Sequence, residues 1–233
     1  MACQLHEPHT GQWLTRSPEY IGWKTFSIRF LWLHGIPGAG KTVLLSHIAE
    51  DIRHYCLARQ ADAFGFAYYY CHFSRGQDEA PHLLRWVIGQ LCRQINGIPP
   101  EVKQLFREGT QPSISQLLGV LAVVIQSFSR VYLAIDALDE SSKRDEILKL
   151  LVRIAKDEKF QRILLLATSR KELEIERMLS NVTTDMSLSN SYVDEDIKSF
   201  IDNKLSEDYQ FSRWPQNLKL EIESALVKGA NGM

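Results

Sequence analysis

The stretch that decides the fold is Phe30-Leu31-Trp32-Leu33-His34-Gly35-Ile36-Pro37-Gly38-Ala39-Gly40-Lys41-Thr42. A short apolar run leads into residues 35–42, which match G-x-x-x-x-G-K-[ST], and residues 42–59 then repeat apolar side chains at helix spacing. Glycines let the backbone curl so that successive N–H groups point inward at phosphate oxygens, and a following helix adds its positive N-terminal end. The stretch therefore predicts a strand, a phosphate-binding loop and a helix rather than a simple connecting turn.

The residue types in this loop indicate a nucleoside triphosphate bound together with Mg²⁺. We expect Lys41 to neutralise the β- and γ-phosphates and the Thr42 hydroxyl to be a ligand of Mg²⁺. The sequence shows no pattern that reads adenine or guanine, so ATP and GTP both remain candidates. The predicted nucleotide-binding residues are Gly35, Ile36, Pro37, Gly38, Ala39, Gly40, Lys41 and Thr42.

Apolar runs typical of strands alternate with helical patterns along the rest of the chain. The predicted strands are residues 30–34, 64–71, 131–135, 162–167 and, more weakly, 182–188. Helices are predicted at residues 42–59, 81–95, 100–107, 113–128, 142–156, 171–178, 193–205 and 216–228, with a polar hinge at 206–215. This order predicts an α/β fold of three layers, with a parallel five-stranded sheet and helices on both faces.

Acidic residues follow the predicted buried strand 131–135. Asp136 stands at the carboxyl end of that strand, where open α/β sheets bind ligands, and we expect it to hold Mg²⁺ with Thr42. Glu140, with Asp139 as second choice, is expected to orient a water molecule for attack on the γ-phosphate. In the alternative interpretation, this acid pair only begins the next helix, with Ser141 or Ser142 as its cap.

A polar triad, Thr168-Ser169-Arg170, ends the predicted strand 162–167. Arg170 could sense the γ-phosphate through charge-assisted hydrogen bonds. The alternative is a solvent-exposed arginine at the start of a short helix that Thr168 and Ser169 cap. With Lys41, Asp139 and Glu140, Arg170 completes the predicted catalytic set.

Composition excludes several classes of protein. The 233 residues carry 27 basic and 28 acidic side chains, so no electrostatic footprint for nucleic acid stands out. The longest apolar run, residues 117–125, is shorter than the roughly 20 residues of a membrane helix. The cysteines at positions 3, 56, 71 and 92 are scattered, with neither zinc spacing nor a disulfide framework. We therefore expect a cytoplasmic protein without nucleic-acid or membrane partners.

Residues 33–42, 136–140 and 168–170 together resemble the NACHT class of signal-transducing P-loop NTPases. More narrowly, they resemble the nephrocystin-like N-terminal NTPase domain of fungal proteins that carry ankyrin or WD40 repeats. Residues 10–13 with 19–23, and residues 83–92, fit the same subgroup. The resemblance implies that the sensor strand lies between the loop strand and the acidic strand, which would bring Lys41, Asp136 and Arg170 to one edge.

The resemblance also implies a domain organisation. Residues 1–29 would pack on the NTPase core, residues 30–205 would form that core, and residues 206–233 would begin a truncated helical domain. In the family, a segment like 228–233 continues into further helical and winged-helix domains, so we expect a fragment that lacks the domains for self-association and partner binding.

The N-terminal segment has two interpretations. Trp13 and Trp23 could pack a helix against the core, which is the more frequent role of tryptophan. The resemblance suggests instead that residues 10–13 lie beside the nucleotide base.

Three functions remain open from the sequence. The favoured one is a nucleotide-binding switch that hydrolyses ATP or GTP slowly to control self-assembly, and the alternatives are an interaction scaffold with a structural P-loop and a P-loop kinase. The acid pair favours attack by water over transfer to a held substrate. Residues 136–139 do not match D-x-x-G, and residues 203–206 lack the aspartate of N-K-x-D, which argues against a Ras-type GTPase.

Overall fold

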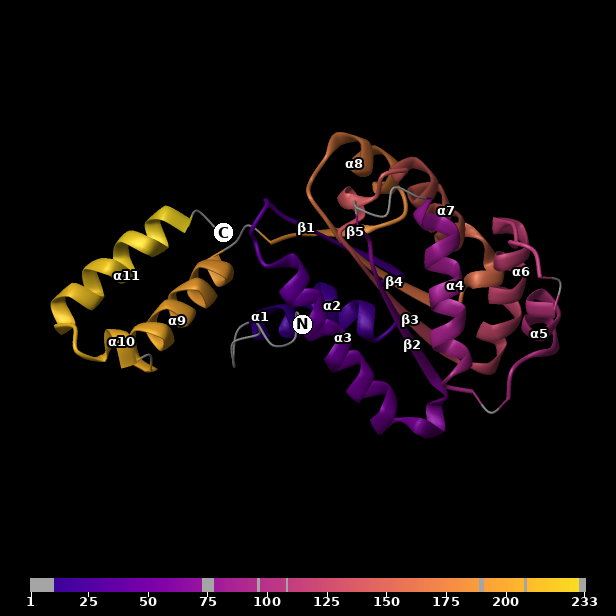
Figure 1. Cartoon of the computed structure of the whole chain (residues 1–233), viewed down its shortest axis with the longest axis horizontal. Coiled ribbons are helices and arrows are strands. Elements are labelled where there is room, and N and C mark those ends of the chain that lie inside the picture. Colours follow the sequence, from indigo (N-terminus) through magenta and orange to yellow (C-terminus); the bar gives the residue numbers. More distant parts are fainter. Residues whose placement is uncertain are drawn as a thin grey trace.

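A parallel sheet of five strands forms the centre of the molecule (Figure 1). The computed structural model describes residues 11–72, 78–95, 97–107, 109–188, 191–207 and 209–230. The strands are β1 (Phe30–His34), β2 (Phe64–Tyr70), β3 (Arg130–Asp136), β4 (Ile163–Ser169) and β5 (Thr184–Ser187). They lie in the order β2-β3-β4-β1-β5, which confirms the predicted sheet.

The strand order places β4 between β1 and β3, as the family resemblance implied. The register pairs Phe30 of β1 with Leu165 of β4, and Leu133 of β3 with the same Leu165. The three central strands are therefore aligned, and their carboxyl ends meet at one edge of the sheet. The residues that follow these ends build the candidate site.

Helices cover both faces of the sheet (Figure 1). One face packs on α1 (Gln12–Arg16), α2 (Pro18–Lys24) and α3 (Lys41–Ala58), and the other on α4 (Glu79–Cys92), α6 (Ile114–Val124), α7 (Arg144–Lys156) and α8 (Leu173–Leu179). Helix α5 (Pro100–Arg107) contacts α6. In β3, the side chains of Tyr132 and Ala134 pack in the apolar cluster under α1, α2 and α3. Those of Val131, Leu133 and Ile135 pack in the cluster on the opposite face, under α4, α6, α7 and α8. Burial of both faces explains why β3 is continuously apolar.

The N-terminal segment packs on the α3 face. The Trp23 side chain is fully buried, with ring centroids 5.7 Å from Tyr20 and 5.3 Å from Tyr132. Trp13 is partly buried against the same cluster, and its Nε1 donates to Asp196 Oδ2 at 3.0 Å. Both tryptophans therefore pack as the first interpretation predicted. Of residues 10–13, which the resemblance placed beside the nucleotide base, Thr10 lies outside the described residues, as does Cys3.

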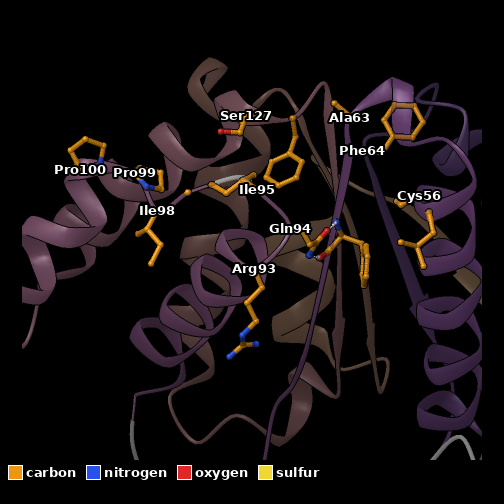
Figure 2. A pocket seen from close by; sticks show the side chains of 14 residues that line it. Cys56, Ala63, Phe64, Arg93, Gln94, Ile95, Ile98, Pro99, Pro100 and Ser127 are labelled. Atoms are coloured by element: carbon orange, nitrogen blue, oxygen red, sulfur yellow. Dashed lines mark hydrogen bonds between the residues drawn. The ribbon is translucent and has the colours of Figure 1, made fainter.

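The free edge of β2 is covered by two glutamine side chains, Gln90 of α4 and Gln94 in the turn just after that helix (Figure 2 shows Gln94). The Gln94 amide accepts from Phe66 N at 3.1 Å and donates to Phe66 O at 2.6 Å; Gln90 does the same to Tyr68, at 3.3 and 2.7 Å. Each side chain thus makes the hydrogen bonds to the β2 backbone that a neighbouring strand would make.

Two grooves follow the free edge of β2. One of about 980 Å³ lies at the amino end of β2, and one of about 890 Å³ reaches Thr42.

The chain ends in three helices, α9 (Ser191–Glu207), α10 (Tyr209–Ser212) and α11 (Gln216–Ala230), which lie to one side of the sheet (Figure 1). The prediction of a hinge over residues 206–215 was partly wrong, because residues 209–212 form a helical turn. The Phe211 ring packs on Trp214, with centroids 4.9 Å apart, and this local apolar contact supports the turn. No helix in the described ranges combines the length and the apolar character of a membrane span.

Candidate functional site

The loop between β1 and α3 has the backbone of a phosphate cradle. Gly38 and Gly40 have φ angles of 81° and 72°, in the left-handed region that favours glycine. A Cβ atom added at Gly35 would lie 3.1 Å from the Cβ of Leu188, which is closer than most Cβ contacts in real structures. Helix α3 begins at Lys41, so its N-terminus and the positive end of its dipole meet the loop.

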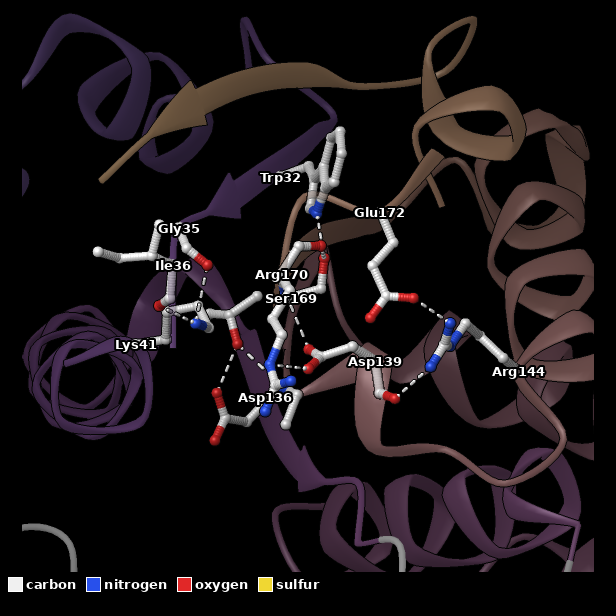
Figure 3. A network of polar contacts seen from close by, with 12 residues as sticks. Trp32, Gly35, Ile36, Lys41, Asp136, Asp139, Arg144, Ser169, Arg170 and Glu172 are labelled. Atoms are coloured by element: carbon white, nitrogen blue, oxygen red, sulfur yellow. Dashed lines mark hydrogen bonds and ion pairs between the residues drawn. The ribbon is translucent and has the colours of Figure 1, made fainter. Parts of the chain in front are cut away.

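Lys41 folds back over this loop (Figure 3). Its Nζ donates to the carbonyl oxygens of Gly35 at 3.0 Å and Ile36 at 2.8 Å. Partial burial lowers the pKa of Lys41, and the nearby charge of Asp139 opposes that shift most strongly. Among the described residues, the ammonium group therefore donates only to neutral carbonyl oxygens of the glycine loop, and phosphate oxygens would be stronger acceptors.

Asp136, at the end of β3, is held by two threonines. Thr42 Oγ1 donates to its Oδ2 at 2.7 Å, and Thr168 Oγ1 donates to its Oδ1 while accepting from Ala137 N at 3.0 Å. Burial raises the pKa of Asp136, and the hydrogen bonds from Thr168 and Thr42 partly oppose the rise. The Thr42 hydroxyl and the Asp136 carboxylate are adjacent hard oxygen ligands, so this pair fits Mg²⁺.

The structure separates the two acids that the sequence treated as a pair. Asp139 is turned inward, with 6% of its side chain exposed; its Oδ1 accepts from Arg170 N at 2.9 Å and its Oδ2 lies 3.1 Å from Arg170 Nε. Glu140 is exposed, and no side chain or amide in the described part of the chain donates to its carboxylate. The Asp139 carboxylate is therefore engaged, whereas Glu140 is available.

The alternative interpretation of the acid pair as a helix start was wrong. Residues 138–140 form a 3-10 turn, entered through Ala137 with a φ of 56°, and α7 begins only at Arg144. The residue that precedes α7 is Lys143, so neither Ser141 nor Ser142 caps it. Positive φ at a residue other than glycine is strained and is often found at functional sites.

Thr168 and Ser169 do not cap α8, because both belong to β4 and are fully buried. The strand ends two residues later than predicted, since its pairing with β1 continues to His34 opposite Ser169. Ser169 Oγ accepts from Trp32 Nε1 at 2.9 Å and donates to Arg170 O at 2.8 Å (Figure 3). Arg170 is half-exposed and bound to Asp139, so it is not simply a solvated arginine.

Sequence reasoning missed four residues of this network: Trp32, Arg144, Glu172, and Thr168 as a partner of Asp136. Arg144 Nη2 donates to Asp139 O at 2.5 Å, and its Nη1 is paired with Glu172 (Figure 3). One sequence signal could have pointed to Arg144. A cation in the first turn of a helix is disfavoured by the helix dipole, so its presence there indicates a stabilising contact elsewhere. The roles of Trp32 and Thr168 depend on the neighbouring strand and have no local signal.

A family model and several solved structures match the chain. The family described as nephrocystin 3, N-terminal, matches residues 9–170. No curated protein matches the chain at a significant level.

Solved structures share the fold at low identity. The chain is similar to Cdc6p of Pyrobaculum aerophilum, with 17% identity, a TM-score of 0.52, and coverage of 87% of this chain and 50% of that one. It is similar to the ADP form of ORC2 from Aeropyrum pernix, with 15% identity, a TM-score of 0.57, and coverage of 90% and 56%. A Walker-type ATPase of Pyrococcus abyssi aligns over 100% of this chain and 69% of its own, with 15% identity and a TM-score of 0.53.

The chain thus spans about half the length of the first two of these proteins. The family match covers well over half of the chain. The chain belongs to the nephrocystin 3 N-terminal family and has the fold of the P-loop ATPases.

Proposed function

We propose that this chain is the nucleotide-binding module of a NACHT-like signalling switch. It binds ATP or GTP with Mg²⁺ and hydrolyses it slowly, and the bound nucleotide controls self-assembly through other parts of the protein, as in fungal NLR-like immune or incompatibility proteins. One observation carries the proposal: Lys41, the Thr42–Asp136 pair and the Asp139–Arg170 pair converge at one edge of the sheet (Figure 3). Its partners are a nucleoside triphosphate and protein, without nucleic acid or membrane, in the cytoplasm.

Nucleotide binding would exchange contacts that the residues already make. Lys41 leaves the carbonyls of Gly35 and Ile36 for the β- and γ-phosphates, and the loop amides bind the same oxygens. Thr42 and Asp136 would hold Mg²⁺, which neutralises charge on the phosphate oxygens when bound. Because Asp136 is buried and fixed by Thr168, it is positioned before any ligand arrives.

Hydrolysis would depend on positioning and charge neutralisation rather than on covalent chemistry. Glu140 is the acid that is free to orient water, because Asp139 is engaged by Arg170. Arg170 would report the γ-phosphate by leaving Asp139 for it, a change of partner at a switch segment. Turnover should be slow, since switch NTPases gain most of their rate from an arginine supplied by a partner.

The first test is calorimetric titration of the purified chain with non-hydrolysable analogues of ATP and GTP, with and without Mg²⁺. We expect Mg²⁺-dependent binding that Lys41→Ala abolishes and that Lys159→Ala, an exposed lysine outside the site, leaves unchanged. Retained affinity in Lys41→Ala would refute the P-loop site. A folded wild-type chain that binds neither analogue would favour the interaction scaffold instead.

A further inference from the structure

Arg144 occupies a position that its own helix does not favour. It is the first residue of α7, where the helix dipole disfavours a cation, and only 22% of its side chain is exposed. Its Nε is buried without a hydrogen-bond partner among the described residues. The contacts of Nη1 and Nη2 must therefore explain why an arginine stands at this position.

These contacts join two turns that are distant in sequence (Figure 3). Nη2 donates to the backbone oxygen of Asp139 at 2.5 Å, in the acidic turn of residues 138–140. Nη1 is paired with the Glu172 carboxylate and lies 3.6 Å from Glu174 Oε2, in the segment that follows β4. One guanidinium thus binds both the acidic turn and the segment just after Arg170.

The contacts close into a ring of four residues. The Asp139 carboxylate binds the amide and Nε of Arg170, and the amide of Glu172 donates to Arg170 O at 3.1 Å. Glu172 in turn binds Arg144, which binds Asp139. The ring therefore has two bridges between the turns, and the bridge through Arg170 is the one that a γ-phosphate would open.

We propose that Arg144 is a positioning residue that couples the acidic turn 138–140 to the segment 170–172. While the Arg170 side chain is bound to Asp139, both bridges hold the turns; once that side chain leaves, Arg144 is the side chain that keeps the acidic turn, and with it Glu140, in place beside the remaining contact from the Arg170 amide. Arginine suits this role because its planar fork reaches two acceptors at once, whereas lysine offers a single point charge. The catalytic consequence rests on the proposed function, but the coupling of the two turns does not.

Hydrogen exchange without nucleotide tests the coupling itself. In Arg144→Gln we expect the amides of Glu140, Arg170 and Glu172 to exchange about tenfold faster, because the loss of the Arg144 hydrogen bonds to Asp139 O and Glu172 lets the turns that hold these amides open more often. The Leu44 amide, bonded to Gly40 O in the first turn of α3, should not change. The control is Arg153→Gln, an exposed arginine on the same helix. Equal exchange in the two variants would overturn the proposal.

Two further variants guard against simple misfolding. Glu172→Gln with Glu174→Gln removes the negative charges that pair with Arg144 and leaves only neutral amide oxygens as acceptors, at partly exposed side chains that the core does not need. It should accelerate the same three amides. Arg144→Lys keeps the charge but loses the fork, so it should give an intermediate rate; full protection with lysine would contradict the bidentate role.

With nucleotide, Arg144→Gln should keep its affinity for the diphosphate, because the loop is intact, and lose about tenfold in kcat with little change in KM. An equal loss of affinity for diphosphate and triphosphate would show a merely structural role and overturn the proposal. A wild-type chain that binds no nucleotide would refute the proposed function, and the exchange experiment would still decide the coupling.

Discussion

The clearest prediction concerns the two neighbouring acids, which the structure gives different roles. Asp139→Asn and Glu140→Gln remove the same charge one residue apart, so each is the matched control of the other. Asp139 is almost fully buried and binds the amide and Nε of Arg170, whereas Glu140 is exposed. We expect Asp139→Asn to lower stability and Glu140→Gln to lower turnover.

The size of the stability effect follows from the contacts. Hydrogen bonds to charged groups contribute about 1.5–3 kcal/mol and neutral ones about 0.5–1.5 kcal/mol. Asparagine keeps an oxygen for the Arg170 amide but loses the charge that faces Nε. Because 51% of the Arg170 side chain is exposed, solvent screens the pair, and we expect a loss of about 1 kcal/mol. For a chain of this size that is about 2–4 °C in Tm, while Glu140→Gln should stay within about 0.5 kcal/mol of wild type.

Thermal unfolding followed by circular dichroism, together with single-turnover hydrolysis, measures both effects. If Glu140 orients the water, Glu140→Gln should slow hydrolysis by about a hundredfold or more while nucleotide binding is retained. Asp139→Asn should bind triphosphate more tightly than wild type, because Arg170 no longer has to leave a carboxylate. The reasoning is refuted if the two variants have the same Tm, or if Asp139→Asn alone abolishes turnover.

Two further predictions test the metal site and the sheet edge. Burial raises the pKa of Asp136, so the folded state binds a proton at this carboxyl group more readily than the unfolded chain does. Proton binding therefore contributes fully to the free energy of unfolding below the ordinary carboxyl pKa, and this contribution is lost as the pH rises through the raised pKa of the folded state. Without nucleotide, Asp136→Asn should therefore be at least as stable as wild type at pH 7 and should have no stability advantage at acid pH. The variant should also lose Mg²⁺-dependent nucleotide binding. Lower stability than wild type at pH 7, measured by thermal unfolding at several pH values, would contradict this. Gln90→Leu with Gln94→Leu should expose the edge of β2 and cause self-association in light scattering, whereas a monomer would show that the glutamines do not protect the edge.

The sequence was sufficient for the parts of the molecule whose signals are local. The glycine loop, the apolar strand before it and the amphipathic helix after it all lie within residues 30–59, and each has its own periodicity or motif. The place of β4 between β1 and β3 came from the family resemblance, since periodicity carries no information about strand order.

The contacts between strand ends could not be predicted from the sequence. Thr168 looks like a helix cap because it precedes a helical pattern, but pairing with β1 extends β4 through Ser169 and turns Thr168 toward Asp136. The engagement of Asp139 by Arg170 joins residues 31 positions apart, just after the ends of the adjacent strands β3 and β4. Both errors arise at the site because there the neighbouring strand, rather than local propensity, decides the partner.

The same contacts explain how one site could distinguish two nucleotides. Lys41 is bound to loop carbonyls, Thr42 to Asp136 and Arg170 to Asp139, so the site is already internally satisfied and binding is an exchange of partners. A diphosphate can take Lys41 from its carbonyls but offers nothing to Arg170. Only a γ-phosphate competes with the Asp139 carboxylate, and a ligand shifts a two-state element only by its difference in affinity for the two states. In the proposed switch, the Asp139–Arg170 pair would therefore be the contact whose strength sets how sharply the chain separates triphosphate from diphosphate.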